Sequence, residues 1–549
     1  MTARPSAMRL SVGPRLIGWL AAAALALAYI ATAPVNRTDA EDAYDFAWQV
    51  EHARGRDLLH PHHLLALPIF RAVYRAVTWL APGTRAIATM GFMSAWAAAA
   101  SVVLMAQLLH RTGLRDRRAE LAAAALAVSF GFWRYAAEAE LYALATALCL
   151  WAWVRAAEEI EHERPPWLSS VLGAGAILVH VFSVWATVVA VPLWLWRRDG
   201  LRRAIRYGAG VVGVVAVAYL AAGQLPAHQV GGPDPLRSEG GLRPSAAIKA
   251  AIAAGSTVVA GHFALAQSHL AAWLQHRFPA RMLEEELYLA RRISPAWQAV
   301  AWTTLATCLA AALSLIASAV RGRKRPNVAH GTTAVQGLDG DGRTPSKDWT
   351  ALRWAAGAWW VGHAALLLWM EPGNPELWVM SLPPLWMLVV GAPALRMRRW
   401  WVFVLLLGLH NWVGGMSLLC DPAGDLYRAK ADAVLRVTQP GDVIWTAGGP
   451  GFFRYLRYVS AAEVVDLWAA DPDEGRGRCV WVLGDVLQPP RALAERFPAR
   501  AAVIAHLATR VRPKLELGVS DPFGGVWRLR TMDGTAATTE ASSGPSDKP

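Results

Sequence analysis

Long apolar segments dominate this sequence and restrict what the chain can fold into. Residues 16–33 and 400–419 are two of them, and comparable segments recur in between. A run of about 18 or more apolar residues matches the thickness of the bilayer hydrocarbon and rarely occurs in a soluble core. Of the 549 residues, 55 % are hydrophobic and only 17 % are charged. The sequence therefore predicts an all-α polytopic membrane protein.

The basic residues gather in short clusters between the apolar segments. The clusters are Arg4, Arg9 and Arg15; Arg111, Arg115, Arg117 and Arg118; Arg197, Arg198, Arg202, Arg203 and Arg206; Arg321, Arg323, Lys324 and Arg325; and Arg396, Arg398 and Arg399. Such clusters hold loops on the cytoplasmic side, so an even number of crossings separates neighbouring clusters. About 11 transmembrane helices satisfy this rule, including a tight hairpin over residues 167–196. The net charge of +13 is thus spread over the loops, which argues against nucleic acid as a partner.

The same charge pattern predicts which segments lie on each side of the membrane. Residues 1–15 are expected in the cytoplasm, and the external segments are 34–85, 134–140, 223–295, 371–376 and everything after residue 420. The first apolar segment resembles a signal peptide that ends in small residues at 31–33, but its length favours a retained anchor. We expect a multi-pass protein of a bacterial-type plasma (inner) membrane with its active site on the external, periplasmic side.

The composition changes after the last apolar segment. Residues 16–420 form the predicted transmembrane domain, residues 421–531 have the composition of a soluble α/β unit, and residues 532–549 form a low-complexity tail expected to be disordered. The predicted strands are 442–446, 463–467, 479–483 and 525–529, with a helix over 452–459. Three glycines after the first strand lack the G-x-G-x-x-G spacing and predict a plain strand-to-helix turn. The expected domain is a small extracytoplasmic α/β unit, in which Cys479 could pair with Cys420.

An unusually acidic stretch follows the first apolar segment. Thr38 and Glu41 fit a capping box, which predicts that a helix begins there. Asp39, Asp42 and Asp45 then recur every third residue and share one helix face. The helix dipole explains acidic residues in the first turn, but it explains Asp42 and Asp45 less well, because like charges three residues apart repel. A catalytic base or a metal site is the alternative.

Further polar residues interrupt the apolar pattern at two more places. Arg134, Glu138, Glu140 and Tyr142 lie at an external junction of two spans, and Glu140 and Tyr142 begin the next apolar run. An ionisable group in an apolar run is costly and therefore more often functional. His180 lies within the predicted hairpin, where a lone histidine is more often a hydrogen-bonded packing residue.

These features together resemble a known family. They comprise the acidic stretch after the first apolar segment, a His-Pro pair at His60 that opens an amphipathic segment, Phe132-Trp133 followed by Glu140-x-Tyr142-Ala-Leu, and a hairpin bearing His180 and Pro192. This combination is similar to the C-type (GT-C fold) integral-membrane glycosyltransferases, and most similar to their protein O-mannosyltransferase-like branch. The resemblance covers residues 16–220 in detail and the rest of the chain in topology.

The resemblance implies that a sugar is transferred from a polyprenyl-phosphate-linked donor to a protein, lipid or envelope-glycan acceptor on the external face. Inverting transfer needs a carboxylate that takes the proton of the acceptor hydroxyl. Asp42 is the expected base and Asp45 the second candidate, with Glu140 as a further catalytic residue. The residues expected to bind substrate are Asp39, His60, His62, Arg71, Arg134, Glu138, Tyr142 and His180.

The leaving lipid phosphate needs positive or donor groups, which Arg134, Arg71 or Arg75 could supply from the membrane surface. For Arg71 and Arg75, anchoring at the membrane interface is the simpler interpretation. His60, His62 and His63 could hold a divalent metal with the acidic residues, but some members of the wider fold use none, and we assign no metal. The expected partners are the lipid-linked donor, the acceptor and membrane lipids.

Two other functions fit the same pattern of spans. A transporter or flippase for a lipid-linked glycan also needs many spans and buried polar groups, but the sequence shows no related halves with paired broken helices. A non-catalytic scaffold for envelope assembly is the third possibility.

Overall fold

The computed structural model describes residues 12–35, 41–114, 117–223, 244–277, 284–323, 347–391, 397–471 and 478–530. The expectations for Asp39 and for the tail 532–549 lie outside these residues. The chain forms two compact units, Met1–Arg277 with Leu283–Leu426, and Phe278–Met282 with Tyr427–Pro549. Each unit is described by itself.

Among its described residues the first unit has helices and, apart from an isolated bridge between His60 and His63, no β-structure. Its helices up to residue 222 are α1 (Val12–Ala31), α2 (Glu41–His52), α3 (Ala66–Leu80), α4 (Ala86–Arg111), α5 (Arg118–Val128), α6 (Phe130–Ala136), α7 (Tyr142–Glu161), α8 (Trp167–Val179), the π-helix η3 (Trp185–Ala190), α9 (Val191–Asp199) and α10 (Leu201–Ala222). Those that follow are α11 (Pro244–Val258), η5 (His262–Ala266), α12 (Ser268–Arg277), α13 (Glu284–Ala290), α14 (Pro295–Arg323), α15 (Lys347–Met370), α16 (Pro375–Trp378), η6 (Val379–Ser381), α17 (Leu382–Val390), α18 (Met397–Asn411), the π-helix η7 (Trp412–Met416) and α19 (Ser417–Leu419).

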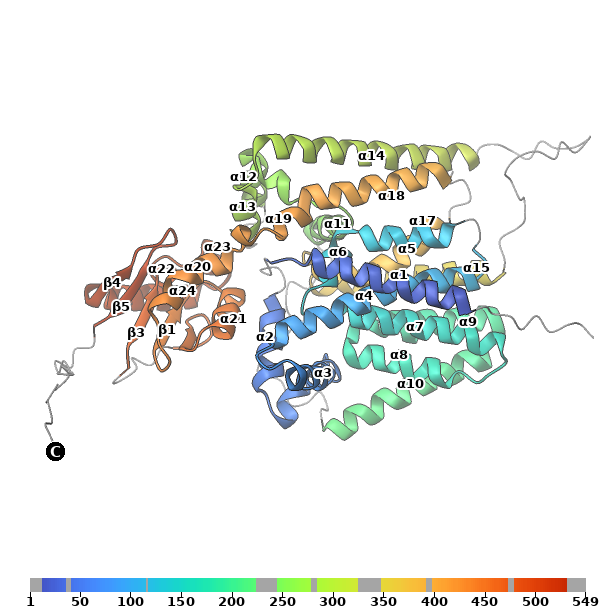
Figure 1. Ribbon diagram of the computed structural model, residues 1–549, viewed down its shortest axis with the longest axis horizontal. Helices are drawn as coiled ribbons and strands as arrows, with labels where there is room; N and C mark the ends of the chain where they lie inside the picture. The colour runs from blue at the N-terminus through green and yellow to red at the C-terminus, as the bar shows by residue number, and fades with distance from the viewer. Residues whose placement is uncertain are drawn as a thin grey trace, which may run out of the picture. The chain divides into compact units, whose positions relative to one another are not determined.

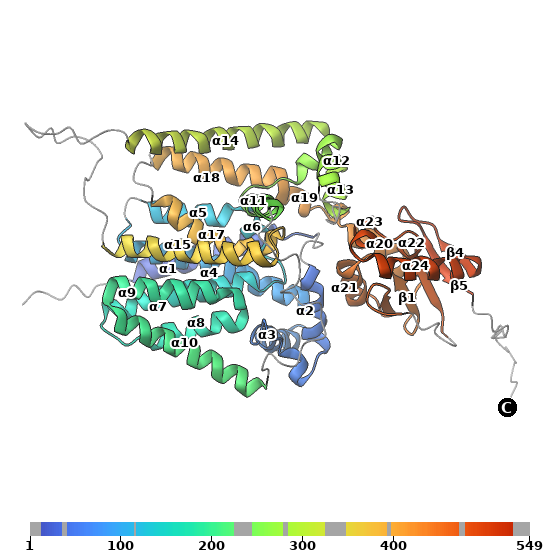
Figure 2. The ribbon, with the colours of Figure 1, turned by 180° about the vertical axis from the view of Figure 1, so that it is seen from behind.

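The long helices of this unit lie side by side in two groups (Figures 1 and 2). In one group α1 packs on α4, α4 on α7, α7 on α8 and α8 on α10. In the other α14 packs on α18, α18 and α17 on α5, and α15 on α17. Contacts of α15 with η3 and α9 connect the two groups. The predicted hairpin is present as α8 and α9, with its turn at His180.

Four helical segments among the described residues are long and apolar enough to cross a membrane: Ala86–Arg111, Leu201–Ala222, Pro295–Ala317 and Met397–Leu419. Shorter apolar helices are Leu16–Ala31, Trp167–Val179, Ser245–Val258 and Pro375–Val390. Several expected spans are shorter than a full crossing because the chain breaks within them, as it does between α5 and α6 and after α8. The figure of about 11 spans stays a prediction.

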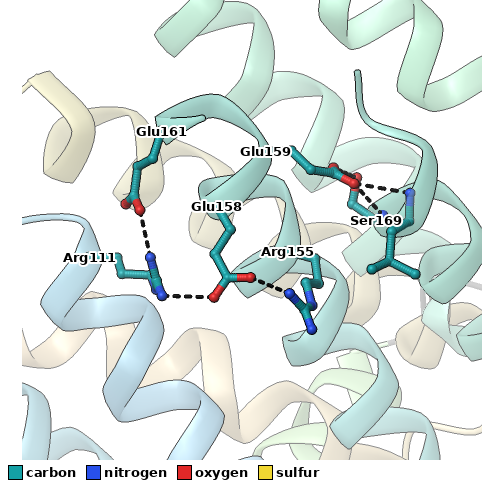
Figure 3. A network of polar contacts seen from close by, with 7 residues as sticks. Arg111, Arg155, Glu158, Glu159, Glu161 and Ser169 are labelled. Atoms are coloured by element: carbon teal, nitrogen blue, oxygen red, sulfur yellow. Dashed lines mark hydrogen bonds and ion pairs between the residues drawn. The ribbon is translucent and has the colours of Figure 1, made fainter. Parts of the chain in front are cut away.

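Polar contacts join the helix ends that carry the predicted cytoplasmic clusters (Figure 3). Arg111 at the end of α4 contacts Glu158 at 2.7 Å and Glu161 at 2.6 Å, both on α7. Glu159 accepts hydrogen bonds from the backbone N–H groups of Leu168 and Ser169 at 3.0 and 3.2 Å, which satisfies the first turn of α8. Exposed ion pairs stabilise little by themselves, whereas a buried carboxylate on two helix-end N–H groups fixes the α7–α8 connection.

A polar group in the interior connects three helices near the opposite ends. The Asn411 side chain donates to the carbonyl oxygens of Val128 and Val258 at 2.7 and 2.9 Å, and it accepts from the N–H of Ala260 at 2.9 Å. His410 contacts the Ala260 carbonyl at 3.0 Å. A buried amide with all these partners satisfied is stabilising and specific, so it fixes the start of the η5 segment against α5 and α18.

The second unit contains a five-stranded sheet in the order β2-β1-β3-β5-β4. The strands are β1 (Val443–Thr446), β2 (Glu463–Asp466), β3 (Val480–Leu483), β4 (Leu515–Val519) and β5 (Val526–Leu529). The helices are α20 (Leu426–Val437), α21 (Pro450–Val459), α22 (Gly484–Leu487), α23 (Arg491–Arg496) and α24 (Pro498–Val511). Strand β1 is parallel to β2 and β3, and β5 is antiparallel to β3 and β4.

The four predicted strands correspond to β1, β2, β3 and β5, and the predicted helix to α21. Gly449 adopts φ +101 in the turn before α21, a conformation that glycine takes without strain. The sequence analysis missed β4, a five-residue edge strand whose residues are exposed or half-buried, although Leu515, Leu517 and Val519 alternate with Glu516 and Gly518. Each of the four cysteines, all of them in described segments, is free.

The predicted sidedness is testable across the segment Met397–Leu419, which is long enough for one crossing. A reporter fused after Arg398 is expected in the cytoplasm, because this residue belongs to a basic cluster, and a reporter fused after Gly441 on the external side. Paired alkaline phosphatase and fluorescent-protein fusions measure both positions. A cytoplasmic signal from both fusions would contradict an external second unit.

Candidate active site

The candidate base Asp42 lies in the first turn of α2. Ala43, Tyr44 and Val50 of α2 are buried, whereas Asp42 is half-buried. Asp42 is close enough to interact electrostatically with Glu140, Tyr142 and Glu376, so the junction of α6 with α7 and the helix α16 lie near it. Asp42 thus combines buried acidic neighbours with access to solvent.

The second candidate, Asp45, is also half-buried and lies one turn further along α2. One of its carboxylate oxygens accepts a hydrogen bond of 2.8 Å from the Gln49 side chain. Asp42 and Asp45 both interact with His60, so the structure brings the two acids and this histidine together.

The loop between α6 and α7, which we call the acidic loop, carries two fully buried glutamates. Glu138 is 0 % and Glu140 is 1 % exposed. The Ser94 hydroxyl of α4 donates to the Glu140 carbonyl at 3.0 Å. At Gly91 of α4 an added Cβ would lie 2.7 Å from the Ala137 carbonyl oxygen. Only glycine therefore lets α4 approach this loop as closely as observed.

The sequence analysis did not single out Glu376, which the structure places beside Glu140. Glu376 is in the short helix α16, where its N–H donates to the Asn374 side chain at 3.1 Å. Its carboxyl group is 7 % exposed and hydrogen-bonds to the side chains of Glu140 and Tyr142. The His363 ring contacts the Leu377 carbonyl at 2.9 Å and holds α16 against α15. The only feature of the sequence that could have identified Glu376 was its position within the predicted external segment 371–376.

The carboxyl group of Glu140 lies in an electrostatic setting that disfavours its charged form. Burial raises its pKa well above the ordinary value, and the nearby carboxyl groups of Glu376, Asp42 and Glu138 raise the pKa further. Two carboxyl groups can hydrogen-bond to each other only if one of them carries a proton. The loop therefore holds a protonated carboxyl group beside the half-buried Asp42.

The histidines of the first external loop lie in a row that leads to Tyr142. The His60 ring stacks on His63 at 5.3 Å between centroids, His63 lies 4.8 Å from His180, and His180 lies 5.0 Å from Tyr142. His180 is at the hairpin turn, where the N–H of the next residue donates to the His62 carbonyl at 3.2 Å. Burial lowers the pKa of His60, of His62 and, to about 3, of His63. These three rings are consequently uncharged at neutral pH.

Arg134 is the buried cation nearest in sequence to the acidic loop. Its side chain is 2 % exposed, and its guanidinium lies 3.5 Å from His262 Nε2 and 3.8 Å from Glu285 Oε1. These partners come from η5 and α13, within the external segment predicted at 223–295. The sequence analysis had no reason to place His262 and Glu285 beside Arg134, because the contact is formed only by folding.

The structure does not place Arg71 beside the acids. Its guanidinium donates to the carbonyl oxygens of Ala53 and Gln49, so it caps the end of α2. Asp42 is in the first turn of the same helix, and a rise of about 1.5 Å per residue separates the two ends by roughly 16 Å. Arg75 lies one turn further along α3 with an exposed side chain. Both arginines thus have positions suited to structure and to anchoring at an interface.

A resident metal finds no support among the described residues. They contain no group of three or more His, Cys, Asp or Glu side chains arranged to hold a metal ion. We derive no step through a metal.

Comparisons with known proteins give little further guidance. No protein-family model and no curated protein sequence matches the chain. Among solved structures, the crystal structure of ArnT from Cupriavidus metallidurans bound to undecaprenyl phosphate is similar, with a TM-score of 0.38 and 13 % identity, and so is the apo form, with 0.41 and 14 %. Each comparison covers 94 % of this chain and 98 % of the other. TM-scores this low establish neither the fold nor the function.

The close approach of α4 to the acidic loop generates a prediction. Gly91→Ala should destabilise the protein by about 1–3 kcal/mol, because the new methyl group displaces the Ala137 carbonyl. Thermal unfolding of the purified protein in detergent measures this effect. Gly175→Ala on α8, where an added Cβ has nothing within 4 Å, is the matched control. Equal melting temperatures for the two variants would contradict the described packing.

Proposed function

We propose that this chain is an integral-membrane glycosyltransferase that moves a sugar from a polyprenyl-phosphate-linked donor to an acceptor on the external face of the membrane. The observation that carries the proposal is the position of Asp42, half-buried among the buried acids Glu140 and Glu376. The residues come from three of the segments predicted to be external. The resemblance of residues 16–220 to C-type glycosyltransferases supplies the reaction class.

Asp42 acts as the general base in this proposal. The acceptor hydroxyl oxygen forms a bond to the anomeric carbon, its proton passes to Asp42, and the bond between that carbon and the donor phosphate oxygen breaks. The lipid phosphate leaves with the bonding electron pair. Asp42 is preferred over Asp45 because Asp42 interacts electrostatically with the buried acids Glu140 and Glu376.

Arg134 is the cation that we assign to the leaving phosphate. It lies on the helix that leads directly into the acidic loop, whereas Arg71 lies at the far end of α2. It is buried, and its guanidinium lies 3.5 Å from His262 Nε2 and 3.8 Å from Glu285 Oε1. A buried guanidinium is suited to charge-assisted hydrogen bonds with phosphate oxygens.

The remaining polar residues of the site are assigned to substrate binding. Tyr142, His180, His60 and His62 form an uncharged polar surface beside Asp42, suited to sugar hydroxyl groups, and Glu138 completes the acidic loop. The acceptor class and the sugar follow only from the resemblance. The most specific version of the proposal is a reaction like that of the protein O-mannosyltransferases.

Transport of a lipid-linked glycan is the second candidate function. Two apolar segments are interrupted by polar residues, one at His180 between α8 and α9 and one at Ser381 between α16 and α17. Transporters place their binding sites at such discontinuous helices. A flipping assay with a fluorescent lipid-linked sugar in proteoliposomes discriminates the two functions, since a transferase consumes the donor only when acceptor is present.

The proposed base gives the sharpest test of function. Asp42→Asn keeps the shape and most of the hydrogen bonding but removes the proton acceptor, so turnover should fall by about 10²-fold or more. Donor affinity should persist, because the base acts on the acceptor hydroxyl. Transfer of radiolabelled sugar from polyprenyl-phosphate donors and donor binding are measured on the same preparations.

Asp45→Asn is the matched comparison, with the same chemical change one helical turn away. It is expected to cost much less than Asp42→Asn. If Asp45→Asn is the inactive variant, the base assignment moves to Asp45. If both variants keep near-normal transfer, neither aspartate of α2 is the base and the glycosyltransferase proposal is wrong.

A further inference from the structure

The pairing of Glu140 with Glu376 has a consequence beyond the proposed base. The two side chains come from the α6–α7 loop and from α16, and they are hydrogen-bonded to each other. Both are buried, at 1 % and 7 % exposure. One oxygen of each, Oε1, is buried with no hydrogen-bond partner among the described residues. Two buried carboxylates in direct contact would repel strongly, so the contact is compatible only with a protonated pair.

A third side chain indicates which member holds the proton. The Tyr142 hydroxyl also hydrogen-bonds to Glu376. A phenol at neutral pH donates, so Glu376 is the acceptor of this bond. Glu376 as the carboxylate then accepts from both Tyr142 and the protonated Glu140. The arrangement connects α16, α7 and the acidic loop through one carboxylate.

We propose that Glu140 and Glu376 share one proton in the active protein, and that this proton keeps the acidic loop and α16 together beside Asp42. Glu376 is thereby a positioning residue for the proposed transfer reaction, and the inference rests on that proposed function. Loss of the proton would place a second negative charge in the pair. The loop and α16 would then separate, and the surroundings of Asp42 would change.

The charged and titratable groups around the pair are Asp42 on α2, Arg134 on α6, Glu138 in the loop, Tyr142 on α7, Lys249 on α11, His363 on α15 and Glu371 before α16. Lys249 packs against Gly373, in the segment that leads into α16. Asp42 and Glu138 disfavour a negative charge on Glu140, and Asp42 and Glu371 disfavour one on Glu376. Burial acts with the three acids, and the raised pKa of Glu140 agrees with a retained proton.

The direction of the pH effect follows from linkage. A carboxyl group whose pKa is raised on folding contributes stability that is complete at low pH and is lost as the pH rises through the folded-state value. Transfer and thermal stability of the wild-type protein should therefore both decline on the alkaline side. For the loss of one proton, the rate should fall about tenfold per pH unit beyond the midpoint.

Glu376→Gln tests the shared proton. The Gln amide donates to an ionised Glu140 and accepts from Tyr142, so the pair keeps one negative charge without a proton to lose. Transfer is measured from about pH 6 to about pH 10 and normalised to the maximum of each variant. The melting temperature in detergent is measured over the same range. We expect the alkaline decline of both quantities to disappear in Glu376→Gln.

Glu371→Gln is the matched control, with the same chemical change at an exposed carboxylate near α16. It should keep the wild-type alkaline decline. Glu140→Gln supplies the amide from the other side of the pair and should give the flattened profile of Glu376→Gln. It replaces Glu376→Gln if that variant fails to insert.

The outcomes separate this inference from the proposed function. An alkaline decline that persists unchanged in Glu376→Gln and Glu140→Gln would overturn the shared proton, and so would its absence from the wild-type protein. If the wild-type protein shows no transfer but its melting temperature falls with pH and the Gln variants lose this fall, the proton pair stands and the glycosyltransferase proposal fails. Flattened transfer and melting profiles in the Gln variants support both.

Discussion

Burial of carboxyl groups is the constraint on which the candidate site depends. Moving a single ionised carboxylate into an apolar surrounding is unfavourable, and Glu138, Glu140 and Glu376 are all buried within one region of the first unit. A fold keeps such groups only if protons, hydrogen bonds or opposite charges compensate. Here Glu140 and Glu376 hydrogen-bond to each other, and Tyr142 contributes a further donor. The half-buried Asp42 lies within electrostatic reach of this hydrogen-bonded pair.

The framework around these acids consists of close backbone approaches and satisfied polar groups. Gly91 lets α4 contact the acidic loop, and Ser94 fixes the loop by its carbonyl. His363 holds α16, and Asn411 holds the start of η5, which brings His262 toward Arg134. None of these residues touches a reacting atom in the proposed mechanism. They determine whether the acids converge, because a site built on packed helices is positioned more accurately than one on free loops.

The predicted sidedness assigns the polar groups of the first unit to two sides of the membrane. The contacts of Arg111 with Glu158 and Glu161 lie beside a predicted cytoplasmic cluster, whereas Asp42, Glu140 and Glu376 come from predicted external segments. Acidic residues contribute little to orientation, so the glutamates beside Arg111 do not alter this assignment. The proposed catalysis on the external side rests on that orientation.

The sequence by itself determined the helical, membrane-type character of the first unit, the α/β character of the second and the acidic loop residues as site candidates. These properties depend on local patterns: apolar run length, alternation in short strands, and charges next to apolar segments. It missed β4, a short edge strand in which the alternation of Leu515, Leu517 and Val519 extends over only five residues. Only the tertiary structure decided that Glu376 joins Glu140, that Arg134 meets Glu285, and that Arg71 caps a helix end far from Asp42. These contacts join segments distant in the chain, and a pattern read along one segment contains no information about which other segment folding brings against it.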